Sequence, residues 1–342
     1  MVVGSEASSA QEVKKYQPKA GDYQYHFGVG EPVMRLQPGD IVETYTERTD
    51  TGYYRQFGNS VPKDAPPNPY LPNPVTGPFY IEGAAPGDTL VVRLLSIEPA
   101  EDTAIGLTGP TFGGLTPTRY TQMLGKPPVD RLTSWTYKVD TEARTVEFQA
   151  NDSSITVKLP LRPFLGCLGV APANGEVRQT TVPGFFGGNM DTPEVRAGTT
   201  VYLPVNEPGA LLYLGDGHAV QGEGEIAGTA AEISMNVKFQ VDVIKGRRIQ
   251  TVRMEDDTYL MTAGSTKPLE DAMRVASAEM IRWLAEDYGF SPLDAYEFLS
   301  VAMESSVSQL VDPNYTILVK IRKEYLPPVR SVDAGQLLPH LH

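Results

Sequence analysis

Short runs of alternating apolar and polar residues, separated by Gly and Pro, make up most of the chain as far as about residue 260. This pattern is typical of strands joined by tight turns, because side chains along a strand alternate between the two faces of a sheet. So many strands predict a mainly β protein with a β-sandwich or barrel core. Besides those that follow the turns described next, strands are expected at 142–151, 154–161, 209–216, 233–244 and 316–326.

One turn-then-strand phrase occurs three times, as QPGDIVETYT (37–46), APGDTLVVRL (85–94) and RAGTTVYLPV (196–205). In such a phrase Pro fixes one backbone angle of the turn, Gly supplies a positive φ, and the alternating residues that follow enter a strand. We interpret the repeat as a recurring turn rather than as an internal duplication.

The C-terminal part has a helical period instead. Residues 265–289 place one apolar stripe along a helix that Ser265 or Thr266 caps and Gly289 ends. Ser291 followed by Pro292 predicts the start of a second helix. We expect both helices to cover one face of a small sheet that includes 316–326. The stripe consists of Leu269, Ala272, Met273, Ala276, Met280, Trp283 and Leu284.

These patterns suggest a division into four parts. We expect an N-terminal β-sandwich part at 1–100, a β-rich insert or small barrel at 101–180, a β-rich part with the candidate site loops at 181–260, and a smaller C-terminal α+β part at 261–342.

Composition narrows the class of protein. The chain has 342 residues, of which 41% are hydrophobic, and its formal net charge is −13. That charge repels phosphate backbones and anionic lipids, so we expect neither a nucleic acid nor a membrane as partner. No run of about 18 apolar residues is present, which predicts a soluble protein.

The single cysteine and the first residues bear on location. Cys167 lies in an apolar stretch and is expected to be a buried packing residue rather than a reactive thiolate. The first residues lack the basic and apolar regions of an intact signal peptide. We expect a cytoplasmic protein, with a periplasmic one after removal of a signal peptide as the alternative.

Histidine is scarce, which limits the metal chemistry. His340 and His342 lie in a polar tail, so His26 and His218 are the only histidines expected in the folded body. A site with several histidines is thereby excluded, and any metal must be held largely by carboxylates and carbonyls. His218 lies in GDGHAVQGEGE (215–225), where acidic residues crowd among glycines. Such crowding indicates a bound metal or a carboxyl group with a raised pKa, with a solvated acidic turn as the alternative.

Two further segments carry candidate chemistry. In GFFGGNMDTPE (184–194) the paired glycines expose backbone N–H groups, Asn189 offers an amide donor, and Asp191 is a metal ligand or base by type. Asp50 ends another expected strand. A plain turn would also explain each of these features. No Gly-x-Ser-x-Gly elbow is present. The glycine-rich segment 106–115 lacks the Lys-Ser/Thr ending of a phosphate loop, so we interpret it as a mobile or substrate-shaping loop, with an ordinary long surface loop as the alternative.

Taken together, four colinear segments resemble the acetamidase/formamidase family: 73–92, 162–173, 187–232 and 264–313, with the resemblance spanning most of 30–326. It implies a predominantly β enzyme that hydrolyses the C–N bond of short amides to a carboxylate and ammonia, as a homo-oligomer. Some relatives act on cyclic amides and carry zinc or calcium. The segment 107–130 departs from the commonest version in the family, which affects the expected substrate most.

The resemblance also implies a site, in which a divalent metal, zinc in preference to calcium, activates a water. Two alternatives stay open: a metal-dependent lactamase, and a non-catalytic calcium-stabilised β-sandwich binding module. By role, the expected residues are Asp50, Asp191 and His218 around the metal, Glu225 as base with Asn189 and His218 as further catalytic residues, and Gly187, Gly188 and Gln221 at the substrate.

Overall fold

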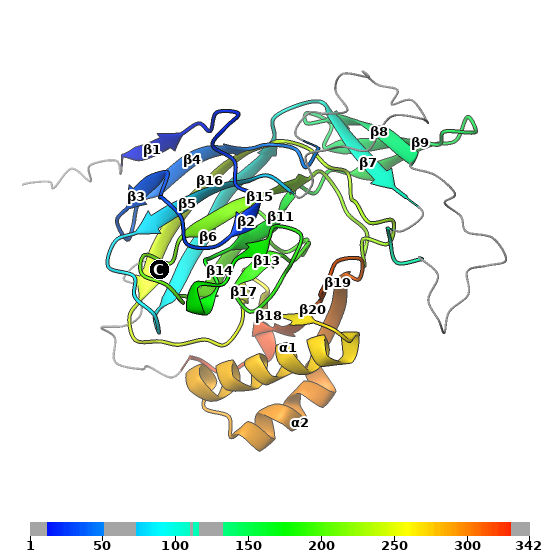
Figure 1. The fold of residues 1–342 in the computed structure, drawn as a ribbon. Coiled ribbons are helices and arrows are strands. Elements are labelled where there is room, and N and C mark those ends of the chain that lie inside the picture. Colours follow the sequence, from blue (N-terminus) through cyan, green and yellow to red (C-terminus); the bar gives the residue numbers. More distant parts are fainter. Residues whose placement is uncertain (1–11, 51–72, 110–111, 116–132, 330–342) are drawn as a thin grey trace, which may run out of the picture.

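The protein is mainly β, as predicted, with 44% strand and 13% helix in a computed structural model (Figure 1). The structure describes residues 12–50, 73–109, 112–115 and 133–329. The expectations for the first residues, for most of the 107–130 segment, and for His340 and His342 fall outside these ranges. No helix in the described ranges has the length and apolar character needed to cross a membrane.

The larger of two main sheets has nine strands, which come from both the N-terminal and the C-terminal parts of the described chain. β16 lies between β4 and β6, so residues from the expected 181–260 part pair on both sides with residues from the 1–100 part. The division into four parts stays a prediction. In spatial order the strands are β1 (Val13–Tyr16), β4 (Ile41–Thr46), β16 (Met235–Ile244), β6 (Thr89–Pro99), β14 (Thr200–Pro204), β17 (Arg253–Glu255), β18 (Tyr259–Thr266), β20 (Tyr315–Arg322) and β19 (Glu304–Gln309).

A five-stranded sheet packs against this one to form the sandwich. One hydrophobic cluster contains residues of both sheets, and the rings of Phe79 and Phe239 meet edge to face across it with centroids 5.5 Å apart. Every residue of the central strands β11 and β15 is buried, because both faces of this sheet are covered. In spatial order the strands are β13 (Gly187–Asn189), β11 (Phe164–Gly169), β15 (Leu212–His218), β5 (Val75–Ile81) and β3 (Met34–Leu36).

Two smaller sheets complete the β structure. The four-stranded sheet projects to one side of the sandwich (Figure 1), and the two-stranded sheet joins distant segments. Short 3₁₀ turns occur at Ala173–Gly175 and Lys323–Tyr325. The strands of the first are β10 (Thr156–Pro160), β9 (Thr145–Gln149), β8 (Thr133–Asp140) and β7 (Thr103–Thr108), and those of the second are β12 (Arg178–Gln179) and β2 (His26–Phe27).

The three repeated phrases form the predicted turns. Gly39, Gly87 and Gly198 have φ angles of 95°, 95° and 89°, which only glycine adopts without strain. Each turn leads into a strand of the nine-stranded sheet, namely β4, β6 and β14.

The helices α1 (Leu269–Trp283) and α2 (Pro292–Ala302) cover β18 and β20 near the far end of that sheet (Figure 1). The helices and these two strands form a second hydrophobic cluster, and the predicted apolar stripe of α1 faces it. A π-helical turn continues α1 to Tyr288, and Gly289 ends it with a left-handed backbone conformation. The predicted cap of α1 was wrong: Ser265 and Thr266 belong to β18, and Pro268 precedes the helix without a side-chain cap. The predicted start of α2 is confirmed, because Ser291 accepts a hydrogen bond from the Asp294 N–H.

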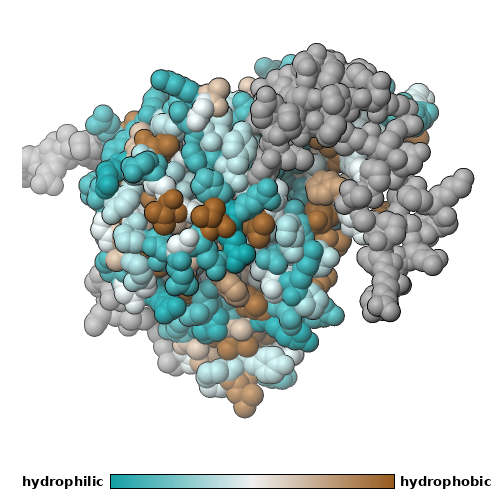
Figure 2. Space-filling model, viewed as in Figure 1, coloured by the Kyte–Doolittle hydropathy of each residue, from teal (hydrophilic) through white to brown (hydrophobic). Residues whose placement is uncertain are grey.

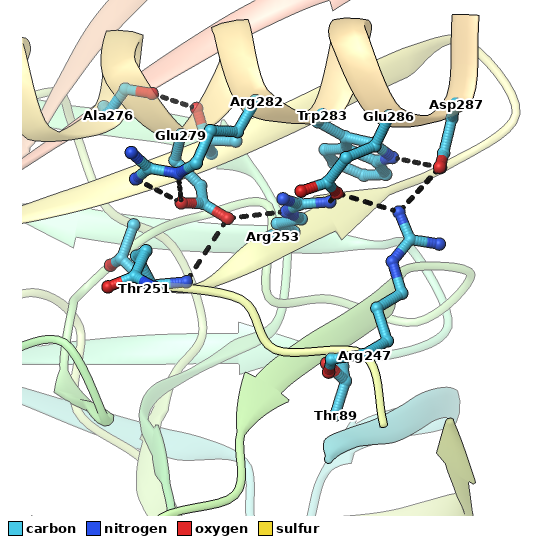
Figure 3. A network of polar contacts seen from close by, with 12 residues as sticks. Thr89, Arg247, Thr251, Arg253, Ala276, Glu279, Arg282, Trp283, Glu286 and Asp287 are labelled. Atoms are coloured by element: carbon cyan, nitrogen blue, oxygen red, sulfur yellow. Dashed lines mark hydrogen bonds and ion pairs between the residues drawn. The ribbon is translucent and has the colours of Figure 1, made fainter. Parts of the chain in front are cut away.

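A network of ion pairs joins α1 to the sheet (Figure 3). Glu279, which is fully buried, accepts from Arg253 Nε at 2.7 Å and from Arg282 Nη2 at 2.6 Å. In the π-helical turn, Glu286 accepts from Arg253 Nη1 at 3.0 Å and Asp287 accepts from Arg247 Nη2 at 2.8 Å. We call these three acids and three arginines the α1 network.

The visible surface is mostly hydrophilic, with scattered hydrophobic residues (Figure 2). Some of them lie at the lower end of this view, where Figure 1 places the two helices. On α2, Leu293, Tyr296 and Val301 are more than half exposed, at 76%, 62% and 77%. Scattered exposed apolar residues of this kind are usual on a protein surface.

Candidate active site

The candidate residues meet over β11, which lies between β13 and β15 in the five-stranded sheet. Cys167 of β11 pairs with Asn189 at the end of β13 and with Gly215 of β15. Asp216 and His218 lie at the C-terminal end of β15, and His218 is the last residue of the strand. The sequence segments 184–194 and 215–225, which were expected to carry chemistry, are therefore brought side by side.

Gly166 in β11 makes room for two acids. A Cβ atom at this position would lie 2.4 Å from Asp191 Oδ1 and 2.5 Å from Asp216 Oδ2. Only the absence of a side chain allows the two carboxyl groups to occupy that space, since real Cβ contacts are never so short. The backbone thus forms a cradle that a methyl group would fill.

Three acids of the site have left-handed backbone angles. The φ angles are 46° at Asp191, 59° at Asp216 and 49° at Glu225. Such angles cost about 1 kcal/mol or more for a residue other than glycine, and strain of this kind gathers at functional sites.

Glu225 lies in a turn that two other segments hold. The Gly224 N–H donates to Val307 O at 2.7 Å and Gly224 O accepts from the Leu310 N–H at 3.1 Å, both from the C-terminal part. On the other side, the Gly114 N–H donates to Ile226 O at 2.9 Å. The last residues of the glycine-rich segment 106–115 therefore contact the turn that carries Glu225.

His218 is 1% exposed, and Gln221 fixes its orientation. The side-chain N–H groups of Gln221 donate to Asp191 O at 2.8 Å and Ser308 O at 2.9 Å, so its Oε1 must accept from His218 Nδ1 at 2.9 Å. The proton is thereby placed on Nδ1, and Nε2 is directed toward carboxylates. Gln221 was predicted to contact substrate, which stays a prediction, while in the structure it orients the imidazole.

The carboxylates around Nε2 come from both sides. Asp216 Oδ1 lies 3.5 Å and Glu232 Oε2 lies 3.2 Å from His218 Nε2. Burial alone would lower the pKa of His218, but the Glu232 and Asp216 carboxyl groups raise it, and the net shift is well upward. Without a bound cation the imidazole is therefore positively charged at neutral pH.

Burial shifts the acids toward their protonated forms. It raises the pKa of Asp191 well above its usual range, and the nearby Glu225 and Asp312 carboxyl groups raise it further. Burial likewise raises the pKa of Glu225, although His218 opposes it. The pKa of Asp312 rises to about 7 because of burial, although hydrogen bonds with Asp191 and Asn189 lower it. Several of these acids therefore hold a proton at neutral pH unless a cation compensates them.

The amide of Asn189 links the cluster. Its Nδ2 donates to Asp191 Oδ2 at 2.8 Å and to Asp312 Oδ2 at 2.6 Å, and its Oδ1 accepts from Asn73 Nδ2 at 2.9 Å and from Cys167 Sγ at 2.8 Å. Burial raises the pKa of Cys167 well above its usual range, so this buried residue is a thiol, as expected for a packing position. The oxyanion role of Asn189 stays a prediction, since both of its N–H bonds are used here.

Two buried oxygens of the cluster lack a hydrogen-bond donor. One is Asp191 Oδ1, and the other is Glu232 Oε2, whose contact with His218 Nε2 is not directed as a hydrogen bond. A buried acceptor without a donor is costly unless a cation satisfies it. Two groups have ligand atoms within 4.8 Å of one another: Asp191, His218 and Glu225, and Asp216, His218 and Glu232. These buried acids and the imidazole could hold a metal, and their donor atoms are those that zinc accepts.

Asp50 lies outside both groups. Its Oδ1 and Oδ2 accept from Arg48 Nε at 2.7 Å and from Arg48 Nη2 at 3.0 Å. The neighbouring Thr49 hydroxyl donates to Asn73, whose Nδ2 also donates to Asp216 Oδ2 at 3.0 Å. The Asp50 segment therefore reaches the cluster, while its carboxylate pairs with arginine.

The remaining predicted positions are glycines. Gly187 and Gly188 are buried in β13 with φ angles of 92° and 91°, and the Gly187 N–H donates to Gly184 O. A Cβ atom at Gly187 would lie 2.3 Å from Leu168 O, so close packing requires glycine there. Their contact with substrate stays a prediction.

Sequence reasoning missed four residues of the site: Asn73, Gly166, Glu232 and Asp312. Glu232 and Asp312 follow short apolar runs, AA and LV, and an isolated acid after an apolar run is the signal that could have found them. Gly166 and Asn73 carry no such signal, because their roles depend on which strands are neighbours.

Comparison with known proteins shows which family this chain resembles. Residues 14–182 and 173–325 match the sequence profile of the Acetamidase/Formamidase family. The crystal structure of an acetamidase from Yersinia enterocolitica superimposes with a TM-score of 0.81 at 34% identity, covering 93% of this chain and 94% of that one. The acetamidase of Mycolicibacterium smegmatis is 28% identical over 50% of this chain and 53% of its own length, and the formamidase of Methylophilus methylotrophus is 26% identical over 50% and 51%. The chain thus matches about half the length of these two curated relatives. Most of its length nevertheless matches the family profile, and the chain belongs to the acetamidase/formamidase family.

Proposed function

We propose that this protein hydrolyses the C–N bond of short linear amides, with formamide and acetamide as the first substrates to test. The observation that carries the proposal is a buried cluster of acids around one imidazole, with two carboxylate oxygens that lack a donor. Its relatives are named acetamidase and formamidase, which gives the reaction class.

In this proposal Asp191 and His218, which belong to one of the two groups of neighbouring ligand atoms, hold a divalent cation. His218 presents Nε2, and Asp191 presents the oxygen that lacks a hydrogen bond. Glu232 belongs to the other group and lies beside the imidazole, whereas the oxygens of Asp50 are held by Arg48. An imidazole among the donors favours zinc over calcium, which prefers oxygen ligands. A bound divalent cation would polarise the amide carbonyl and lower the pKa of a water molecule.

Glu225 handles the proton. It is 6% exposed, against 1% for Asp191 and 2% for Glu232, so it is the acid of the three most open to solvent. Burial raises its pKa, and a carboxyl group with a raised pKa is a stronger base toward water and can return the proton afterwards. Glu225 therefore takes the proton of the attacking water and delivers it to the leaving nitrogen, which departs only when protonated.

Ammonia release tests the proposal. Purified protein is assayed with formamide and acetamide before and after chelation and after addition of Zn²⁺ or Ca²⁺. We expect turnover that chelation removes and Zn²⁺ restores, and a fall of about 10²-fold or more in kcat for Glu225→Gln with zinc affinity kept. Undiminished turnover in metal-free protein would contradict the metal. Turnover of cyclic amides alone would favour a lactamase, and binding without turnover would favour a binding module.

Two broader expectations belong to this proposal. We propose a homo-oligomer, and light scattering tests its mass. We also propose a cytoplasmic location, which cell fractionation tests.

A further inference from the structure

The Asn189 side chain has no hydrogen-bonding capacity left. A primary amide has two N–H donors and two acceptor lone pairs. Asn189 uses both N–H bonds on Asp191 and Asp312, and its oxygen accepts from Asn73 and Cys167. We call these five residues the Asn189 network.

Only one orientation of the Asn189 amide fits this network. A flipped amide would turn its N–H groups toward the Asn73 and Cys167 donors, and its oxygen toward two carboxylates. The orientation observed ties up Asp191 Oδ2 and leaves Asp191 Oδ1 without a donor, over the cradle at Gly166.

Asp312 brings the C-terminal part into this network. It follows β19, is 7% exposed, and its backbone N–H donates to Gln309 Oε1 at 3.1 Å. Gln309 is fully buried and its Nε2 donates to Asn314 O at 2.7 Å. The loop that carries Asp312 is thus fixed by its own hydrogen bonds, and it presents Asp312 Oδ2 to Asn189 as a rigid acceptor.

We propose that Asp312 is a positioning residue: it fixes the amide of Asn189, and the fixed amide, together with the hydrogen bond between the Asp312 and Asp191 carboxyl groups, holds Asp191 with Oδ1 free for the cation. The inference rests on the proposed function, since it takes Asp191 as a cation ligand. Asp312 itself does not contact the cation in this proposal. Outer partners of metal ligands typically change affinity by about 10- to 100-fold when removed.

The test uses the only cysteine of the chain as a probe. The S–H stretching frequency of Cys167 reports its hydrogen bond to Asn189 Oδ1, so infrared spectroscopy of the full-length protein follows the orientation of the amide. Zn²⁺ affinity is measured in parallel by competition with a chromogenic chelator. Neither readout requires turnover.

Thr180 O, 3.3 Å from Cys167 Sγ, is a second acceptor within reach of the thiol. In Asp312→Ala we therefore expect the S–H band to shift from its wild-type frequency as the bond to Asn189 Oδ1 is lost, and Zn²⁺ affinity to fall by about 10-fold or more. Asp312→Asn keeps an acceptor oxygen, so it should restore the band and most of the affinity. Asp257→Ala, at an exposed position between β17 and β18, is the matched control and should change neither. If the alanine variant does not fold, Asp312→Ser also removes the carboxylate oxygen that reaches Asn189, while its shorter hydroxyl side chain leaves a polar group in the loop.

The outcomes separate this inference from the function. An unchanged S–H band and wild-type Zn²⁺ affinity in Asp312→Ala would overturn the positioning role, whether or not the enzyme hydrolyses amides. A shifted band and weakened Zn²⁺ binding that Asp312→Asn reverses would support it. A wild-type protein that binds Zn²⁺ but releases no ammonia would overturn the proposed function alone.

Discussion

Two groups of acids in this protein, one with Glu279 buried at its centre and one buried throughout, are built differently. In the α1 network, Glu279, Glu286 and Asp287 meet Arg253, Arg282 and Arg247, one arginine for each acid (Figure 3). In the site, five acids surround one imidazole, and among the described residues no lysine or arginine forms an ion pair with them: Asp191, Asp216, Glu225, Glu232 and Asp312. The fold thus supplies its own cations under the helix and does not supply them in the site.

The comparison shows that burial of acids is not in itself a sign of function. The α1 network also contains an unpartnered atom, Arg253 Nη2, but this guanidinium makes two other ion pairs and lies over the Trp283 ring. In the site the unpartnered atoms are acceptors on different acids, Asp191 and Glu232. Acceptors without donors beside an excess of negative charge call for a cation, whereas a spare donor between two acids does not.

The largest effect is expected where the two acids share the Gly166 cradle. Gly166→Ala places a methyl group 2.4 Å from Asp191 Oδ1, so the carboxyl groups must separate. We expect Zn²⁺ affinity and ammonia release to fall by more than about 100-fold, because a ligand itself is displaced. Gly222→Ala is the control, since no atom lies within 4 Å of its Cβ position in the Glu225 loop. Wild-type Zn²⁺ binding in Gly166→Ala would contradict the location of the ion.

The α1 network should respond in stability instead. Glu279→Gln removes a charge that pairs with Arg253 and Arg282, and Arg253 is 2% exposed. Breaking a buried ion pair leaves an uncompensated charge, so we expect a loss of about 3 kcal/mol in the free energy of unfolding. Denaturant titration measures it, with Glu270→Gln at an exposed position of α1 as control. Zn²⁺ affinity should not change; if it did, the two acid groups would not be independent.

The stability of the metal-free protein should depend on pH, because no cation compensates the buried acids of the site. Folding raises the pKa of Asp312 from 3.8 to about 7. The folded state then holds a proton that the unfolded state has released, so stability is fully present below about pH 4 and is lost as the pH rises through about 7. The raised pKa values of Asp191, Glu225 and His218 act in the same direction.

Thermal unfolding of metal-free protein between pH 4 and 8 checks this. We expect the melting temperature to fall by several degrees over that window, and saturating Zn²⁺ to flatten the fall, because the cation takes the place of the protons. A melting temperature that rises with pH in the metal-free protein would show that the acids are compensated by the protein itself.

How far the sequence predicts the fold depends on how local each signal is. The alternation at 233–244 and the glycine turns before β4, β6 and β14 are local, and the strands follow. The cap of α1 was predicted wrongly because Ser265 and Thr266 are good caps by type, yet their pairing with Thr316 and Tyr315 of β20 extends β18 through them. Tertiary pairing overrode a local preference there.

The residues of the site also differ in whether a local sequence signal predicts them. His218, Asp191 and Glu225 could be found because acids and a histidine among glycines are unusual along the chain. Asp312 lies more than a hundred residues from Asn189, at a sequence separation of 123, and nothing local predicts their contact. Asp50 was expected at the metal from the family resemblance, and only the structure shows that Arg48, two residues away, is its counter-ion.

The smallest effect we expect is also the one that separates the two acid groups most sharply, because its sign is opposite to that of Glu279→Gln. In the wild type the Ala230 N–H donates to Glu232 Oε1 at 2.9 Å, and in Glu232→Gln the amide oxygen can still accept this hydrogen bond. Glu232 is the first of the groups that raise the pKa of His218, so without its charge burial favours the neutral imidazole, whose Nε2 lone pair can accept from the new N–H group. The carboxylate charge, the imidazolium charge and the orphaned oxygen then disappear together, so metal-free Glu232→Gln should be more stable than the wild type by about 1 kcal/mol, while Zn²⁺ affinity falls at least about tenfold. Denaturant titration of the metal-free proteins and chelator competition measure the two effects, and a loss of stability in metal-free Glu232→Gln would mean that the site acids are compensated as fully as those under α1.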